Sequence, residues 1–215
     1  MDEEATLVVV DYGAGNLRSV QRAIGAAGEQ ALVTSDRRDV ERASALVLPG
    51  VGSANDAMKR LRALDLVEPL RAYAASGRPF LGVCVGLQLL FDWSDEGGGV
   101  DCLGIVPGTV RRFEADLAAG RKVPHMGWNS VHVTRPDPFV EGIADHSYFY
   151  FVHSYYAVPT NPADILGETQ FGLPFAAMVA RENVVATQFH PEKSADLGLR
   201  LYRNFAVRAR GTATV

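Results

Sequence analysis

Cys84 stands in a segment whose pattern predicts an exposed and reactive thiol. Gly82 and Gly86 lie two residues to either side of it, between an apolar run typical of a strand and a second run that begins a helix. This is the pattern of a nucleophile elbow, a sharp turn that needs small neighbours so that crossing backbones can approach. A helix N-terminus favours the thiolate, and the N–H of Val85 could receive the negative oxygen that forms when the thiolate attacks a carbonyl.

His190 and Glu192 supply the two further groups that a cysteine nucleophile needs. They follow a β-rich stretch, and Pro191 between them ends the strand. In such an arrangement the imidazole takes and returns the thiol proton, while the carboxylate holds the ring in the required tautomer. The alternative is that Cys84 is a small apolar residue at a strand end, as most unpaired cysteines are. Its own segment leaves the two interpretations equal, and the His190 segment favours the nucleophile.

The elements that must position these groups begin with the alternation typical of a doubly wound α/β sheet. Continuous apolar, β-branched runs predict strands that are covered on both faces, the first of them central, and amphipathic or charged segments between them predict helices. The strands are expected at 6–10, 31–34 and 45–48, and the helices at 17–27, 36–42 and 66–76. We expect a capping box at 65–68 to start the last helix and Gly77 to end it. Residues 13–16 are interpreted as a turn, because Arg18 occupies the third glycine position of a dinucleotide fingerprint.

The C-terminal half predicts hairpins rather than crossovers, because β-branched and aromatic residues alternate there between Pro, Gly, Asn and Asp turns. Strands are expected at 105–110, 131–134, 148–152, 155–158, 176–180 and 184–189. Glu182 and Asn183 form an expected hairpin tip, and a final helix is expected from Ala195 to Arg208 behind Ser194 as its cap. The expected fold class is α/β, with a mostly parallel central sheet flanked by helices and added antiparallel strands. We find no repeat or long linker, so residues 1–215 are expected to form one domain.

Composition excludes several classes of function. The net charge of −4 in 215 residues offers no footprint for nucleic acid. The acidic start and the lack of a long apolar run predict neither a signal peptide nor a membrane span, and so a cytoplasmic protein. Cys84 and Cys102 lack paired spacing, which argues against a disulfide, and Cys102 is expected to be inert and half-buried. No metal site is expected, because the histidines lack ligand spacing and acids do not cluster around them in the sequence: His125, His132, His146 and His153.

These motifs resemble a known family. Residues 82–86, with His190 and Glu192, look like the triad of class I glutamine amidotransferases, which release ammonia from the glutamine side chain. Further segments narrow the resemblance, over about residues 8–205, to the glutaminase subunits of imidazole glycerol phosphate synthase: 11–16, 48–52, 124–129, 151–155 and 188–194. The segment 125–129 is the most specific of them. Val85 stands where that family more often has leucine, which matters little because the role belongs to the backbone N–H.

The resemblance implies roles for further residues. An oxyanion hole is implied at the backbone of Gly50, Val51, Gly52 and Val85, and a glutamine site at Gly52, Gln88, Tyr150, Ser154 and Tyr155. A partner-binding face is implied at Asn16, His125, Met126, Trp128 and Lys193. The implied partner is a cyclase with a (β/α)₈-barrel fold that forms a heterodimer with this chain and uses its ammonia in histidine biosynthesis. No cofactor is implied.

The residues alone leave alternatives open for several of these roles. Residues 49–53 could be a plain turn, residues 124–129 a turn-like plug of the core, and Tyr150 and Tyr155 core aromatics of a strand. Other functions also remain: an amidotransferase subunit of another pathway such as anthranilate synthesis, a free-standing γ-glutamyl hydrolase, or a non-catalytic regulatory module that keeps only the fold.

Overall fold

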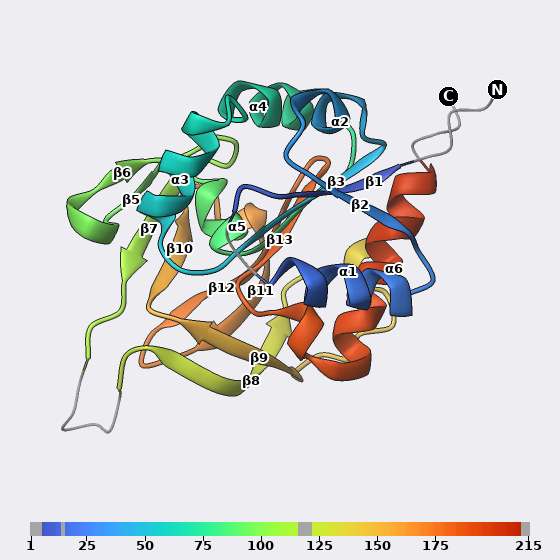
Figure 1. Cartoon of the computed structure of the whole chain (residues 1–215). Coiled ribbons are helices and arrows are strands. Elements are labelled where there is room, and N and C mark those ends of the chain that lie inside the picture. The colour runs from blue at the N-terminus through green and yellow to red at the C-terminus, as the bar shows by residue number, and fades with distance from the viewer. Residues whose placement is uncertain (1–5, 14–15, 116–121, 212–215) are drawn as a thin grey trace.

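The fold is built on one mixed sheet, seen in a computed structural model that describes residues 6–13, 16–115 and 122–211. Its strand order is β2-β1-β3-β4-β13-β12-β10-β7-β5-β6, and β11, β8 and β9 extend it from β12 (Figure 1). Five neighbouring strands run parallel: β2 (Ala31–Thr34), β1 (Leu7–Val10), β3 (Ala45–Gly50), β4 (Phe80–Cys84) and β13 (Val184–Thr187). The parallel sheet expected from the apolar runs is confirmed, with β1 an interior, fully buried strand.

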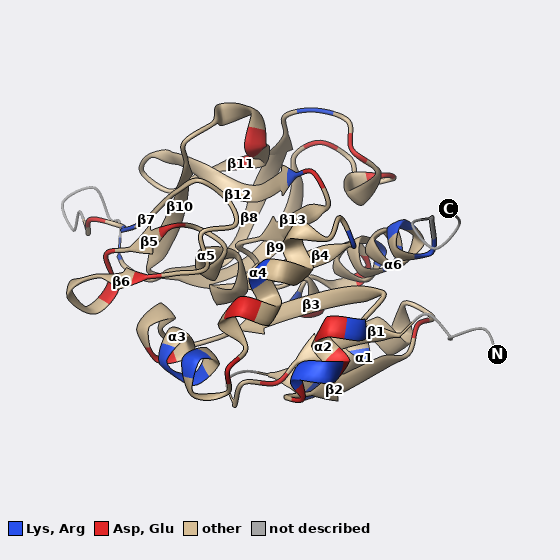
Figure 2. Cartoon of the chain, turned by 90° about the horizontal axis from the view of Figure 1, so that it is seen from above, with Lys and Arg blue, Asp and Glu red and all other residues tan. Residues whose placement is uncertain are grey.

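Helices cover both faces of the parallel strands, as a doubly wound sheet requires. Figure 1 shows α1 and α6 on one side, and α2 and α4 on the other. Their bounds are α1 (Leu17–Ala26), α2 (Arg37–Arg42), α3 (Ala54–Ala63), α4 (Val67–Ala75), α5 (Val85–Leu89) and α6 (Ala195–Gly211). Basic and acidic residues are interspersed on α2, whereas on α3 an acidic residue in the first turn is followed by basic ones (Figure 2). No helix in the described part of the chain is long and apolar enough to span a membrane.

The capping box expected at residue 65 is wrong, because Asp65 ends the preceding helix instead. That helix, α3, was not predicted; the Ser53 hydroxyl caps it by accepting the Asp56 N–H at 3.0 Å. Asp65 has φ +53°, and the N–H of Leu66 bonds the carbonyl of Leu61 at 3.0 Å. This is a Schellman ending, so the helix that feeds β4 starts one residue later than expected. Gly77, with φ +79°, ends α4 as predicted.

The C-terminal half is mainly antiparallel, as the turn-rich sequence predicted. Its strands are β5 (Trp93–Ser94), β6 (Val100–Asp101), β7 (Gly108–Arg112), β8 (His125–Val133), β9 (Ser147–His153), β10 (Tyr155–Pro159), β11 (Ile165–Gln170) and β12 (Pro174–Arg181). Short 3-10 turns lie at Glu96–Gly98, Pro138–Val140, Pro162–Asp164 and Pro191–Lys193. The expected tip at Glu182 joins β12 to β13, and Glu182 takes a positive φ of 53°.

Two expectations in this half are corrected. Residues 125–129 are the first half of the long strand β8 rather than a turn, and they pair in register with β9 from His125↔His153 onward. The hydrogen bonds of the Ser194 hydroxyl go to the backbone of Tyr150 and His190 rather than capping α6. Strand β11 was not predicted. Ala14, Gly15 and the acidic start at 1–5 lie outside the described residues.

Candidate active site

Cys84 sits on the strand-to-helix elbow that the sequence predicted. It is the last residue of β4 and precedes α5, with φ 55° and ψ −107°, a backbone conformation that non-glycine residues rarely adopt. A Cβ on Gly86 would lie 1.9 Å from the carbonyl oxygen of Leu48, so only glycine lets β3 pass this close to the elbow. The sheet register pairs Gly50 of β3 with Cys84.

The fold brings His190 and Glu192 to Cys84 by way of β13. This strand runs parallel to β4, and Thr187 pairs with Val83, so both chains leave the sheet at the same edge. His190 Nδ1 lies 2.7 Å from Glu192 Oε1, and both side chains are 2% exposed. The imidazole also hydrogen-bonds the Cys84 side chain. Since Nδ1 is engaged by the carboxylate, Nε2 is the ring atom that remains for the thiol.

Charge decides the protonation of this imidazole. Burial alone would lower the pKa of His190, but the hydrogen bonds and negative charges of Cys84 and Glu192 outweigh burial and raise it to about 10. The site therefore favours an imidazolium between a sulfur and a carboxylate. Such a group can hand a proton to a leaving amine and then act as a base toward water.

A cavity of about 360 Å³ opens directly over Cys84. Its walls come from the loop after β3, the elbow, β9 with the start of β10, and the turn after β13. The lining residues are Val51, Gly52, Cys84, Val85, Gln88, Glu96, Pro124, Val152, His153, Ser154, Tyr155, His190 and Lys193. This volume suits a small, mostly polar molecule, and its lining includes all but one of the residues expected to touch glutamine.

Tyr150 is the exception, since it is not among the described residues that line the cavity. Its backbone carbonyl accepts the His190 N–H at 3.0 Å, while its ring lies 6.1 Å from that of Trp128, centroid to centroid. Tyr150 thus holds the backbone of His190 in place, and its ring lies near Trp128 and under the Lys193 ammonium, which is 5.8 Å from the ring centroid. Gly50 is also not among the lining residues. It packs closely against the elbow, since a Cβ there would lie 2.7 Å from the Gly86 nitrogen.

A chain of neutral histidines, missed by the sequence analysis, leads from the cavity to β8. His153 Nδ1 lies 2.7 Å from the carbonyl oxygen of Tyr155, and its Nε2 lies 3.0 Å from His125 Nδ1. Because a carbonyl only accepts, His153 donates from Nδ1 and accepts from His125, whose own Nε2 faces the Asn129 amide at 3.3 Å. Burial lowers the pKa of His125 to about 4 and that of His153 to about 3. The pairing at 125 and 153 follows from strand register, which the spacing of the residues does not reveal.

Tyr202 and Gln188 are two further neighbours of the triad that sequence analysis missed. Burial, and then the charge of Glu192, raise the pKa of the Tyr202 hydroxyl well above its usual range. Gln188 Nε2 lies 3.8 Å from Cys84 Sγ, and its amide oxygen accepts from the Gln88 amide at 3.2 Å. The only available signals were the apolar face of α6 for Tyr202 and the position two residues before His190 for Gln188.

The expected partner-binding residues are only partly on the surface. Met126 and Trp128 are 63% and 53% exposed, so the core-plug alternative for this segment is wrong. His125 is buried and is corrected to an interior residue. Asn16 at the start of α1 and Lys193 are exposed. Tyr148, which is 59% exposed, extends the apolar surface on β9.

Two expectations about cysteine and histidine environments also change. Both cysteines are free, and Cys102 is fully rather than half buried; burial raises the pKa of its thiol to about 11, which keeps it inert. The sequence shows no cluster of acids around the histidines, but the fold brings Asp145, the neighbour of His146 in the chain, within reach of His132 as well.

Comparison with known proteins defines the class. The family model "Glutamine amidotransferase class-I" matches residues 8–209, so the chain belongs to the class I glutamine amidotransferase family. Solved structures show the same fold. One titled as a glutamine amidotransferase aligns with a TM-score of 0.73 over 94% of this chain and 98% of its own, at 21% identity. A putative GMP synthase subunit from Thermoplasma acidophilum aligns with a TM-score of 0.70 over 99% and 98%, at 19% identity.

Sequence relatives narrow the family. A protein of Syntrophotalea carbinolica named imidazole glycerol phosphate synthase subunit HisH is 49% identical over 93% of this chain and 98% of its own length. Proteins of the same name from Desulfitobacterium hafniense (strain DSM 10664 / DCB-2) and Moorella thermoacetica are 46% and 47% identical, each over 96% of this chain and 96% and 98% of their own lengths. Within its class the chain thus falls among the HisH proteins.

Proposed function

We propose that this chain is the glutaminase subunit of an imidazole glycerol phosphate synthase. It hydrolyses L-glutamine to glutamate and ammonia as a single domain in the cytoplasm. A (β/α)₈-barrel cyclase then uses the ammonia to make imidazole glycerol phosphate and an aminoimidazole carboxamide ribotide in histidine biosynthesis. The observation that carries the chemistry is the contact of Cys84 with the buried His190–Glu192 pair, on a strained elbow under a 360 Å³ cavity.

The proposed reaction begins with attack of the Cys84 sulfur on the side-chain amide carbon of glutamine. The oxygen of the tetrahedral intermediate takes the negative charge and accepts hydrogen bonds from the Val85 N–H and from the backbone between Gly50 and Gly52. The His190 imidazolium protonates the nitrogen, ammonia leaves, and a γ-glutamyl thioester remains on Cys84. His190, now neutral, removes a proton from water, whose oxygen attacks the thioester carbon. Glutamate leaves, and the thiolate–imidazolium pair is restored.

Binding is proposed for groups that line the cavity. Backbone groups of Ser154 and Tyr155 hold the α-carboxylate, while Gly52 and Gln88 fix the remainder of the glutamine. Gln88 is well held for this, since its amide donates to the Tyr155 carbonyl at 3.1 Å and to Gln188. The whole step needs no cofactor, because nucleophile, acid and base all come from this chain.

The rival functions differ in what the chain would do with its ammonia. The identity to HisH proteins favours this synthase over another pathway's amidotransferase, whereas the solved structures below 25% identity speak only for the fold. An assembled Cys84–His190–Glu192 set speaks against a regulatory module without chemistry. A free-standing hydrolase is separated from the proposal by co-purification with a barrel partner.

The test replaces the nucleophile in the reconstituted complex. Cys84→Ala abolishes glutamine hydrolysis but leaves the complex able to use added ammonium, because the thiol serves only to generate ammonia. Cys102→Ala, which removes the other thiol, is the matched control and keeps both activities. An electrophilic glutamine analogue labels the wild type and the Cys102 variant but not the Cys84 variant. Loss of ammonium-dependent synthesis in a folded Cys84→Ala complex contradicts this division of labour.

A further inference from the structure

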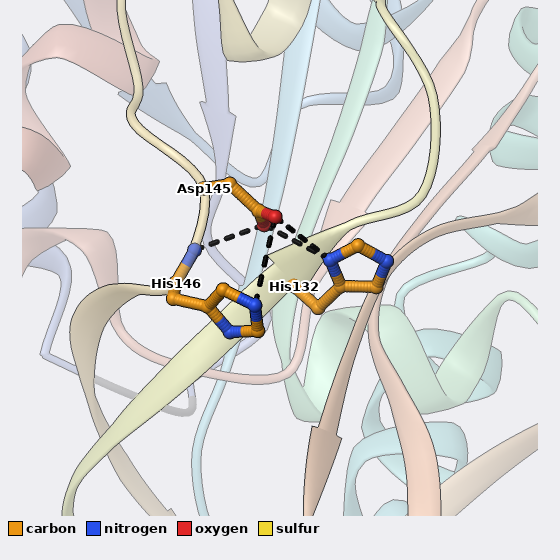
Figure 3. Close-up of side chains that lie close together, drawn as sticks. All are labelled: His132, Asp145 and His146. Carbon is orange, nitrogen blue, oxygen red and sulfur yellow. Dashed lines mark hydrogen bonds and ion pairs between the residues drawn. The ribbon is translucent and has the colours of Figure 1, made fainter.

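Two exposed histidines meet across the end of the β8–β9 ladder. The register pairs Val131 with Ser147, so the next pair outward is His132 with His146, on the face of the sheet that also carries Trp128. The two imidazole rings are stacked, with centroids 5.3 Å apart and planes 23° from parallel. Asp145 precedes His146, and its carboxylate lies beside the two rings and faces one nitrogen of each (Figure 3).

The carboxylate is anchored by the backbone and faces both rings. Asp145 Oδ1 accepts the N–H of Val133 at 2.7 Å and that of His146 at 2.9 Å. Its Oδ2 lies 2.9 Å from His132 Nδ1 and 3.6 Å from His146 Nε2. Among the described residues this is the group of three histidine, cysteine or acidic side chains whose donor atoms lie within 4.8 Å of one another. His132 Nδ1 also lies 3.0 Å from Oδ1, so this nitrogen faces both oxygens, while His146 Nε2 faces Oδ2. The two backbone N–H groups hold the carboxylate in this position.

We propose that His132, Asp145 and His146 form a surface site for a divalent transition metal. The ligand atoms are His132 Nδ1, Asp145 Oδ2 and His146 Nε2. A Zn²⁺ ion holds imidazole nitrogen and carboxylate oxygen at about 2.0–2.2 Å, so any two ligand atoms on one ion lie within about 4.2 Å. The ligand atoms here lie within 4.8 Å of one another. Movements of less than about 1 Å would bring them to metal-binding distances, and exposed side chains can make such movements.

The donor set selects the kind of metal. Two imidazoles and one carboxylate suit Cu²⁺, Ni²⁺ and Zn²⁺, whereas Ca²⁺ and Mg²⁺ prefer oxygen ligands throughout. Three ligands from the protein leave positions for water, as in an open site. The two backbone N–H groups that hold Oδ1 serve as the outer partners that orient a metal-bound carboxylate. The site is separate from the triad and does not depend on the glutamine reaction.

Occupation of this site has a structural consequence. The metal would clamp the end of β8 to the segment that begins β9, and these two strands carry Met126, Trp128 and Tyr148 on the same face. A bound ion stabilises the folded chain in proportion to its affinity and concentration. The melting temperature therefore rises with the metal, and this effect is readable without any assay of activity.

The experiment measures metal binding to the untagged Cys84→Ala chain, because a thiolate beside His190 would itself attract zinc and confuse the count. Equilibrium dialysis with Ni²⁺ and with Zn²⁺ is expected to give one equivalent bound, at metal concentrations comparable to that of the protein. Mg²⁺ and Ca²⁺ are expected not to compete. Acidic buffer weakens binding, since protonated imidazole is no ligand.

Conservative variants identify the ligands. Asp145→Asn keeps an acceptor for the two backbone N–H groups, and His146→Asn keeps a residue that tolerates the positive φ of 58° at this position. Each is expected to weaken binding by more than the roughly tenfold loss that follows removal of a ligand's hydrogen-bond partner. Glu141→Gln, an equal charge change at an exposed acid in the same loop, leaves affinity and the metal-induced rise in melting temperature unchanged.

The outcomes are decisive in either direction. Loss of binding in both ligand variants, with normal unfolding curves in the absence of metal, supports the site. Unchanged affinity in either variant, equal loss in Glu141→Gln, or no Ni²⁺ or Zn²⁺ bound to folded Cys84→Ala protein overturns it.

Discussion

Burial lowers the pKa of every interior histidine of this chain, but the groups around each ring decide whether its pKa ends below or above the ordinary value. His125 and His153 face each other, a carbonyl and an amide, so desolvation lowers the pKa of both rings and keeps them neutral. His190 is as deeply placed but contacts a sulfur and a carboxylate, whose charges raise its pKa to about 10. One residue type is thus held neutral at two positions and favoured as an imidazolium at the third, where it is proposed to carry a proton.

Glu192→Gln is expected to lower the pKa of His190, because the ring loses a charge at 2.7 Å while the hydrogen-bonding shape is kept. Glutamine hydrolysis should fall less than in His190→Ala, by about 10²-fold less if this triad behaves as the serine triads do, since orienting a base contributes less than being the base. NMR titration of the His190 ring and steady-state turnover measure the two effects. Equal losses in the two variants, with both folded, contradict the orienting role of Glu192.

The same pKa sets a pH window for stability. The folded-state pKa of His190 lies above the ordinary value of about 6.5, so its contribution to the free energy of unfolding is fully present below that pH. The contribution is lost as pH rises toward about 10. Glu192→Gln moves the upper end of this window to lower pH, which chemical denaturation at a series of alkaline pH values measures.

At the scale of single residues, the sequence predicted that Cys84, His190 and Glu192 belong to one site, and these side chains do meet beside a cavity whose lining was mostly predicted. Cys84 is recognisable from the glycines two residues to either side of it, and His190 from the proline that follows it and ends a strand. The assignment of His125 to the partner-binding face was wrong, because side chains alternate between the two faces of a strand and register decides which face each one takes. The glutamine-binding role of Tyr150 stays a prediction. Tyr202 reaches the triad from α6 through tertiary packing, which carries no local pattern.

Among the elements, β8 and β9 connect the exposed face to the cavity through the His125–His153 pair. Both rings have folded-state pKa values below the ordinary 6.5. As pH falls below 6.5, these rings therefore bind protons in the unfolded chain before they do in the folded chain, and the free energy of unfolding decreases. Their contribution is full above pH 6.5 and is lost as pH falls, down to about pH 4 for His125 and about pH 3 for His153. Each ring adds a slope of up to roughly 1.4 kcal/mol per pH unit in that interval.

His125→Gln tests this pairing. A glutamine amide can donate to His153 Nε2 and accept from Asn129, but it does not titrate. The dependence of the unfolding free energy on pH between about 4 and 6.5 should therefore become less steep, by about the contribution of one ring. Urea denaturation at several pH values measures the slope, and a transition of normal steepness at pH 8 confirms an intact fold. An unchanged slope would show that His125 does not stay neutral in the folded chain.

Element types were predictable in the N-terminal half, apart from helix α3, and less so in the C-terminal half. Buried parallel strands such as β1 and β3 are read from continuous apolar runs, and Gly77 marks a helix end by its need for positive φ. The first half of β8 was not predicted as a strand, because it directly follows Pro124 and combines exposed apolar residues with Gly127, which has φ +127°. Asp65 misled because one acidic residue can begin a helix or, in a left-handed conformation, end one.

At the scale of the whole molecule, the exposed apolar surface of β8 and β9 is expected to bind the cyclase. Trp128→Ala should weaken association with the barrel partner while leaving the melting temperature of the free chain nearly unchanged, because the indole is more than half exposed. Val207→Ala on α6, an equally exposed apolar position, is the control and should leave association unchanged. Calorimetric titration and thermal melts separate the two quantities. A large fall in the melting temperature of the free chain, with unaltered affinity for the partner, would contradict the interface role of Trp128 and indicate a packing role instead.

The loop after β3 is expected to make glutaminase activity depend on the partner. Pro49 and Gly50 are fixed, since the Tyr12 hydroxyl donates to the Pro49 carbonyl at 2.9 Å and Gly50 packs against the elbow. Val51 is exposed, and Gly52 has φ +84° with open space around its α-carbon. The peptide between them can therefore present a carbonyl or an N–H to the oxyanion at little steric cost, and only the N–H helps catalysis.

Absence of one such donor costs roughly 10²–10³ in rate, which is the expected gap between the free chain and its activated complex. Turnover of glutamine should be low for the chain alone and rise with partner, and rise again when the partner holds its nucleotide acceptor, because contacts at Asn16, Trp128 and Lys193 bias the loop. Gly52→Ala should blunt this activation by disfavouring positive φ, at about 1–2 kcal/mol, and Gly52→Asn should blunt it less. Equal turnover in all three states would contradict the switch and favour a free-standing hydrolase. Activation by the partner with no further gain from the acceptor would support the assembly with the partner but contradict coupling to the acceptor.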